Sequence, residues 1–307
     1  MHGIRCQSNL GMEVELQNLA LVEVGTKDPC ALPIQVRIAV KDDIVLADAL
    51  FTKICQRCGL EASSYKYFTL CRGEDYPVRK YRSSDKIHIP ATDLCLEKWC
   101  LNSNSEKKLM KSDPKAVHLL FIQAKHDVAS GKLITTSEEK IKLDECLDPE
   151  FLVEEQYVLM CQKLPDYQTI LVQGCVVCED VMLKSCAFAR NDNVNIFVSK
   201  YGLKIVTENV EYISLSWYEI VKWEYNKKKS VLLYVVHPAD EDYKSYLSLK
   251  SVQAEYLLAA TFEGVRELLA EDKDAEPFLS SMVTKTPEGA TQWENSLFSP
   301  KQALIFS

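Results

Sequence analysis

The sequence predicts an α+β protein built from three lobes, because three consecutive blocks of the chain carry different hydrophobic patterns. Residues 34–91 combine strand and helix patterns, residues 92–165 repeat apolar residues at helical spacing, and residues 166–271 form many short runs rich in β-branched and aromatic side chains. Residues 1–33 are polar and irregular and predict an arm, whereas residues 272–307 turn polar with several prolines and predict a flexible tail.

Composition and charge narrow the class of protein. The chain of 307 residues is 47% hydrophobic and 26% charged, as in an ordinary globular protein, and its net charge of −8 disfavours nucleic-acid binding. The N-terminal residues lack the apolar core of a signal peptide, and no apolar run approaches the roughly 20 residues of a membrane span. We therefore expect a cytoplasmic protein whose twelve cysteines are mostly reduced core side chains.

The first block reads as strand, helix and then short strands. Ile34–Val40 alternates apolar and polar residues, and Asp42 or Asp43 is expected to cap a helix that Gly59 ends. The apolar face of that helix comprises Ala47, Leu50, Phe51, Ile54 and Cys58. Short strands are expected at Tyr65–Arg72, Val78–Tyr81 and Lys86–Ile89. This order suits a ubiquitin-like roll, which composition alone does not establish.

The second block is expected to be a small helical bundle. Asp93 is expected to cap a short helix that runs through Trp99, and Asp113 with Pro114 forms an N-cap and first-turn pair for a longer one. Behind this pair, apolar residues recur at helical spacing until Gly131: Val117, Leu120, Phe121, Ala124 and Val128. Two further helices are predicted at Ser137–Glu145 and Pro149–Leu164.

The third block predicts seven strands followed by one helix, the order of the pleckstrin-homology and phosphotyrosine-binding folds. The predicted strands are Thr169–Val177, Val194–Val198, Leu203–Thr207, Tyr212–Ser216, Val221–Tyr225, Val231–Val236 and Ser245–Leu249. The helix spans Ser251–Ala270, and its predicted core stripe is Ala254, Leu258, Phe262, Val265 and Leu269.

These three blocks in this order resemble a FERM domain, and the motifs resemble the FERM region of the sorting nexins that carry PX and FERM domains. The matching segments are Tyr65–Leu70, Val78–Lys80, Leu94–Trp99, Ala116–Gly131, Trp217 with Trp223, and Phe262–Leu268. Residues 1–33 are too short for a PX or PDZ domain, so the lipid and cargo contacts of those domains are not carried over.

The resemblance implies that the third lobe binds short NPxY or NPxF tails of membrane proteins. In this mode a peptide adds a strand beside strand five, under the last helix. The expected peptide-binding residues are Val221, Trp223 and Tyr225 on that strand, with Leu257 and Thr261 on the helix one position off the predicted core stripe. Trp223 has two possible roles, as a groove residue or as a buried core aromatic.

Three further segments of the chain are candidate contact sites. Lys227, Lys228 and Lys229 are expected in the turn after strand five, where they either meet phosphoinositide headgroups or form a solvated turn. The family resemblance also suggests a Ras-type small GTPase as a partner of the first lobe, although no residue identifies the contact. The tail segment Asn295–Phe298 has the form N-x-x-F, and either occupies a groove of this kind or is unstructured.

No catalytic or cofactor motif stands out, so we expect neither an enzyme nor a cofactor. Cys55 with Cys58 and Cys175 with Cys178 have zinc-like spacing, but structural zinc needs four convergent ligands, and we expect core cysteines and no metal site. The resulting prediction is an adaptor that binds cargo tails at the early endosome membrane and supports sorting and recycling. The alternative is a FERM linker between membrane proteins and the cortical cytoskeleton.

Overall fold

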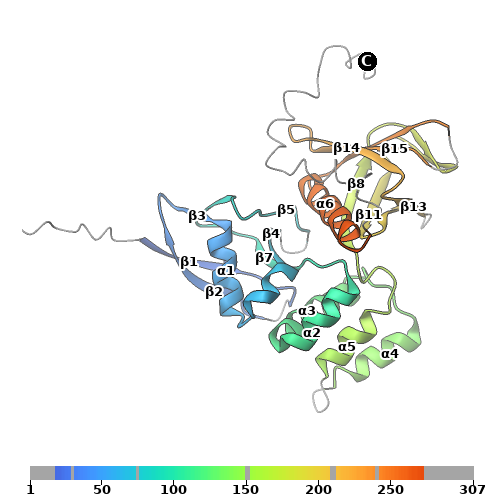
Figure 1. Ribbon diagram of the computed structural model, residues 1–307. Coiled ribbons are helices and arrows are strands. Elements are labelled where there is room, and N and C mark those ends of the chain that lie inside the picture. The colour runs from blue at the N-terminus through green and yellow to red at the C-terminus, as the bar shows by residue number, and fades with distance from the viewer. Residues whose placement is uncertain are drawn as a thin grey trace, which may run out of the picture.

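A computed structural model describes residues 18–28, 31–73, 76–148, 153–207, 212–238 and 242–272, which form three lobes (Figure 1). None of the described helices is long and apolar enough to cross a membrane. The three lobes share contacts through one helix, α6 (Ala254–Glu271), which lies between the sheet of the third lobe and strand β5 (Arg79–Lys80) of the first.

The first lobe consists of three small antiparallel sheets and one long helix. Its strands are β1 (Asn18–Val24), β2 (Ile34–Val40), β3 (Ile44–Leu46), β4 (Phe68–Arg72), β5, β6 (Lys86–His88) and β7 (Leu94–Lys98), with helix α1 (Ala47–Arg57) and a 3-10 helix, η1 (Ala62–Tyr67). β1 pairs with β2, β4 pairs with both β5 and β7, and a parallel bridge between Gly25 and Cys95 joins the two groups. Leu50 and Ile54 of α1 are fully buried in the core of this lobe.

Three predictions for this part of the chain are wrong. Residues 18–24 of the expected irregular arm form β1, whose Val22 and Val24 point into the core. Asp42 and Asp43 adopt positive φ in the turn between β2 and β3 rather than capping α1, which begins after Leu46 without a side-chain cap. Leu94–Lys98 is a strand and not a helix.

The second lobe is a bundle of α2 (Ser103–Ser112), α3 (Pro114–Ala129), α4 (Ser137–Glu145) and α5 (Glu154–Cys161). The predicted cap at Asp113 is confirmed, because its carboxylate accepts the backbone N–H groups of Lys115 at 3.0 Å and Ala116 at 3.2 Å. The same carboxylate accepts the N–H of Glu61 at 2.9 Å and so ties the first lobe to the second. Helix α2 had no counterpart in the sequence prediction.

The third lobe is an antiparallel sheet of seven strands in the order β13-β12-β11-β8-β16-β15-β14. Its strands are β8 (Ile170–Val177), β11 (Asn193–Ser199), β12 (Gly202–Thr207), β13 (Tyr212–Ser216), β14 (Ile220–Asn226), β15 (Val231–Val236) and β16 (Ser245–Lys250). An unpredicted hairpin of β9 (Val181–Leu183) and β10 (Cys186–Phe188) follows β8. All seven predicted strands are present, with ends that agree within one residue.

A buried polar junction joins α6 to the first lobe. The Glu97 carboxylate of β7 lies 2.7 Å from Lys27 Nζ, and it accepts the hydroxyl of Tyr256 from α6 at 3.0 Å. Beside it, the Gln253 amide donates to the carbonyl of Pro77 at 2.9 Å. Burial alone would lower the pKa of Lys27, but Glu97 raises it above its ordinary value. These contacts fix how far α6 stands from the first lobe.

Candidate functional site

Strand β14 lies at one edge of the third-lobe sheet. Among the described strands it pairs only with β15, from Ile220 opposite Val236 to Asn226 opposite Val231. An edge strand presents a row of main-chain N–H and C=O groups that can pair with an added strand. The opposite edge strand, β13, differs because Lys184 from the β9–β10 turn donates to its Ser214 carbonyl at 2.9 Å.

A β-bulge changes which side chains of β14 face inward. The pairing register shifts between Ile220 and Lys222, so Val221 is the extra residue and its side chain is 38% exposed. As a result Ile220 and Trp223, three residues apart, both face the core. Lys222 and Glu224 form an ion pair with each other.

Trp223 is only 7% exposed and belongs to the core of the third lobe. Its ring meets the ring of Phe262 on α6 edge-on, with centroids 5.6 Å apart and an interplanar angle of 82°. Trp223 therefore lies beneath the space between β14 and α6. A guest peptide would touch its rim and could not enclose it, which favours the core role over a free groove anchor.

The structure corrects the middle of the predicted core stripe of α6, whereas Ala254 and Val265 are buried as predicted. Leu257 and Thr261, expected to line a groove, are fully buried, and Thr261 Oγ1 lies 2.6 Å from the Tyr234 hydroxyl inside the sheet. Leu258 and Phe262, expected in the core, are half-buried. The cause is that α6 buries two faces, one on the sheet and one on the first lobe, so its buried arc is wider than one stripe.

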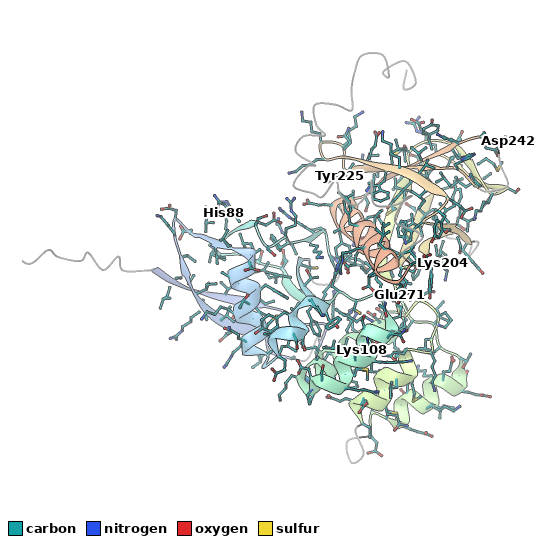
Figure 2. The ribbon with its side chains drawn as sticks, in the orientation of Figure 1. His88, Lys108, Lys204, Tyr225, Asp242 and Glu271 are labelled. Carbon is teal, nitrogen blue, oxygen red and sulfur yellow. The ribbon has the colours of Figure 1, made fainter. Side chains whose placement is uncertain are left out.

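The N-terminal end of α6 brings charge beside Tyr225, the half-buried aromatic residue near the end of β14. Arg79 of the first lobe lies 3.3 Å from Glu255 of α6. Burial, with a smaller contribution from Glu255, raises the pKa of the Tyr225 phenol, while Arg79 opposes the rise. Figure 2 labels Tyr225 at this end of the helix and Glu271 at the other.

We call the strip formed by Trp223, Tyr225, Leu258 and Phe262 beside the outer edge of β14 the β14–α6 groove. Of the predicted peptide-binding residues, Trp223 and Tyr225 lie in this strip, whereas Val221 is the exposed bulge residue and Leu257 and Thr261 are buried. Leu258 and Phe262, which the sequence assigned to the core, lie in the strip instead. Because α6 buries two faces, the spacing of its apolar residues does not show which of them face the sheet.

Lys227, Lys228 and Lys229 are exposed in the turn between β14 and β15, where the sequence placed them. The turn is held by the Asn226 side chain, whose Oδ1 accepts the N–H of Lys229 at 3.1 Å. Three ammonium groups thus extend from the end of β14 that lies near Tyr225.

Of the two cysteine pairs, Cys55 and Cys175 are buried, and Cys58 and Cys178 are partly buried. Burial raises the pKa of Cys55 to about 12 and that of Cys58 to about 11. Burial also raises the pKa of Cys175 to about 11. A search of the described residues finds no group of three or more His, Cys, Asp or Glu side chains able to hold a metal ion. The tail segment Asn295–Phe298 lies outside the described residues.

Comparison of the sequence with protein-family models and with curated proteins finds no match. The structure, in contrast, is similar to solved structures. One of them is the FERM and C-terminal domain complex of Drosophila Merlin, with a TM-score of 0.56 and 14% identity over 83% of this chain and 98% of that chain. The structure is also similar to the MF1 MyTH4-FERM domain of Dictyostelium discoideum myosin VII, with a TM-score of 0.54 and 13% identity over 81% of this chain and 59% of that one.

The chain has the FERM fold. The expected three-lobed α+β architecture is confirmed, since the seven-stranded sheet with its closing helix corresponds to the pleckstrin-like lobe of such domains. Identities of 13–14% show the fold alone and do not assign the chain to the sorting nexins or to any other subfamily.

Proposed function

We propose that this FERM-fold chain is a non-enzymatic adaptor that binds short peptide tails of membrane proteins in the β14–α6 groove. The observation that carries the proposal is the outer edge of β14, which pairs with no second strand in the described part of the chain and lies beside the half-buried Leu258 and Phe262. Main-chain hydrogen bonds to the edge would supply affinity, and the apolar strip would select side chains.

The ligand class follows from the sequence resemblance. NPxY and NPxF tails combine an extended segment, which can add to an edge strand, with an Asn-Pro turn and an aromatic residue. The extended segment would pair with β14, while the aromatic side chain would rest on Phe262 and Leu258. A role in endosomal sorting and recycling, on the cytoplasmic side of the early endosome membrane, is the cellular part of the proposal.

The groove is tested best at Leu258, which is half-buried and needs no core side chain to move. We expect Leu258→Gln to weaken binding of a synthetic NPxF peptide more than about tenfold in titration calorimetry, since the apolar contact is lost. Ala270→Gln, at an exposed position of the same helix, should bind within about twofold of the parent chain. Equal affinity of the Leu258 variant and the parent chain would remove the groove assignment.

Trp223→Ala is a poorer test, because Trp223 lies in the core. Truncating a buried aromatic residue costs about 3–5 kcal/mol of stability. A loss of binding in that variant could therefore reflect a displaced β14 rather than a lost contact.

The three turn lysines suit a second contact, with phosphoinositide headgroups at the membrane that carries the peptide. Each lysine close to an anionic surface contributes about 1 kcal/mol. Replacement of Lys227, Lys228 and Lys229 by glutamine should abolish flotation with liposomes that contain phosphoinositide and leave NPxF affinity unchanged. Equal flotation of the variant and the parent chain would mean that the turn is only solvated.

A further inference from the structure

Strand β1 of the first lobe has one edge that pairs with no other strand in the described part of the chain. Along its other edge, β1 pairs with β2 from Asn18 to Val24. On the open edge only Gly25, the residue that follows the strand, bridges to Cys95 of β7. The main-chain groups along such an edge can pair with an added strand.

The same residues of β1 carry the open main-chain groups and the exposed side chains. Gly25 donates its N–H to the Leu94 carbonyl at 2.7 Å and accepts the Leu96 N–H at 3.0 Å, so both of its groups point away from β2. Because these directions alternate along a strand, Leu19 and Leu21 point their N–H and C=O groups to the same side. Their side chains are 68% and 55% exposed. The open edge is therefore also an apolar one.

Strand β1 lacks the features that usually protect an edge strand. Residues 19–22 read Leu-Ala-Leu-Val, without charge or proline, and the pairing with β2 contains no bulge. Glu23, the first charged residue of the strand, accepts the Gln35 amide of β2 at 2.8 Å. The edge strand β13 differs, because Lys184 is bonded to one of its carbonyl groups. An unprotected apolar edge favours pairing with another chain.

The composition of this edge fits a second copy of the same chain. A two-fold axis brings each residue close to its own counterpart, so a charge near the axis would repel itself, and residues 19–22 carry none. With the axis at Ala20, the two closest residues are small, since opposed residues without hydrogen bonds approach to about 4.5 Å between Cα atoms. Leu19 of each copy then lies opposite Leu21 of the other, and the leucines of both copies form one apolar cluster.

From these observations we propose that the chain forms a two-fold symmetric dimer in which the β1 strands of two copies pair antiparallel through Leu19–Leu21. The two ribbons then join into one sheet in the order β2-β1-β1-β2. Only a few residues of each copy are buried, so the interface lies below about 1,200 Å², and the dimer is weak. Figure 1 shows β1 at the end of the first lobe far from the third lobe, and the pairing uses no residue of the β14–α6 groove.

Sedimentation velocity of the full chain at about 1–300 µM tests the dimer. The parent chain should show a concentration-dependent equilibrium of monomer and dimer. Leu21→Lys places a charge in the leucine cluster and should raise the dissociation constant more than about tenfold. Leu46→Lys is the matched control, because Leu46 is 50% exposed on β3 of the same lobe, and it should leave the dissociation constant unchanged.

A double variant tests the register of the two strands. In a chain with both Leu19→Glu and Leu21→Lys, the new carboxylate of each copy would lie opposite the new ammonium group of the other. We therefore expect this chain to regain most of the association that Leu21→Lys alone removes. A chain that regains its dimer is also folded, so a loss of structure could not explain the effect of the single variant.

Three results would contradict the proposal. A parent chain that stays monomeric up to about 300 µM overturns the dimer. A Leu21→Lys chain that associates as strongly as the parent chain overturns the β1 interface and places the contact elsewhere, on another surface. A double variant that associates no better than Leu21→Lys alone overturns the register, in which Leu19 faces Leu21.

Discussion

At the scale of single residues, Gly264 sets how closely α6 approaches the sheet. A Cβ at this position would lie 2.6 Å from the carbonyl oxygen of Ser199 and 2.6 Å from the Trp217 ring. The same carbonyl accepts the Trp217 indole N–H at 3.1 Å, so neither neighbour can move without breaking a bond. Only glycine lets the helix backbone rest on the β11–β12 turn at this distance.

We expect Gly264→Ala to lower the free energy of unfolding by about 1–3 kcal/mol, because overpacking outweighs the gain of about 1 kcal/mol in helix propensity. Urea unfolding followed by tryptophan fluorescence measures the change. In Ala270→Gly, at an exposed position of α6, only propensity is lost, and stability should fall by about 1 kcal/mol. A Gly264→Ala chain more stable than the parent would show that α6 has room to shift.

At the scale of elements, helices and strands that bury a single face could be predicted from the spacing of their apolar residues. The strands Tyr212–Ser216 and Val231–Val236 and the helix Ser137–Glu145 match the structure residue for residue. Each is bounded by turn residues or by a cap, such as the capping box in which Thr136 and Glu139 bond each other's backbone N–H groups. Local chemistry is enough to define these elements.

Strand β7 shows where local chemistry fails. Leu94, Cys95, Leu96 and Glu97 are all buried, because Leu94 and Leu96 lie in the core of the first lobe and Glu97, on the other face, is covered by Tyr256 of α6. A strand buried on both faces loses its alternation and cannot be told from a helix by period. Glu97 made the segment look partly exposed, because a glutamate is usually a surface residue. Its buried partners Lys27 and Tyr256 lie 70 residues before and 159 residues after it, so the local sequence does not reveal them. The error in the middle of the predicted core stripe of α6 has the same origin, a second buried face supplied by a distant lobe.

At the scale of the whole molecule, the candidate site depends on all three lobes. The sheet supplies β14, while the first lobe holds α6 through Gln253, Glu255 and Tyr256. The second lobe contacts the same helix through Asn102, the N-cap residue of α2, whose amide donates to Glu271. The position of α6 beside β14 therefore depends on its contacts with the first lobe as well as on its packing against the sheet.

This coupling predicts how the molecule unfolds. Glu97→Ala removes the carboxylate that lies beside Lys27 Nζ and accepts the Tyr256 hydroxyl, both in buried surroundings. Removing one partner of a buried ion pair costs about 3–5 kcal/mol. The ion pair with Lys27 lies within the first lobe, and the bond to Tyr256 crosses to α6, so the first lobe should lose stability and its coupling to α6 should weaken as well.

Scanning calorimetry measures both effects. We expect the parent chain to unfold with nearly equal calorimetric and van't Hoff enthalpies, and the Glu97→Ala chain to unfold at lower temperature with a calorimetric enthalpy clearly larger than the van't Hoff value. Tyr256→Phe removes only the hydrogen bond, so it should lower stability by about 1–3 kcal/mol and keep one transition. If Glu97→Ala unfolded in a single transition at the parent temperature, the junction would not be what holds α6, and groove width would have to be set within the third lobe alone.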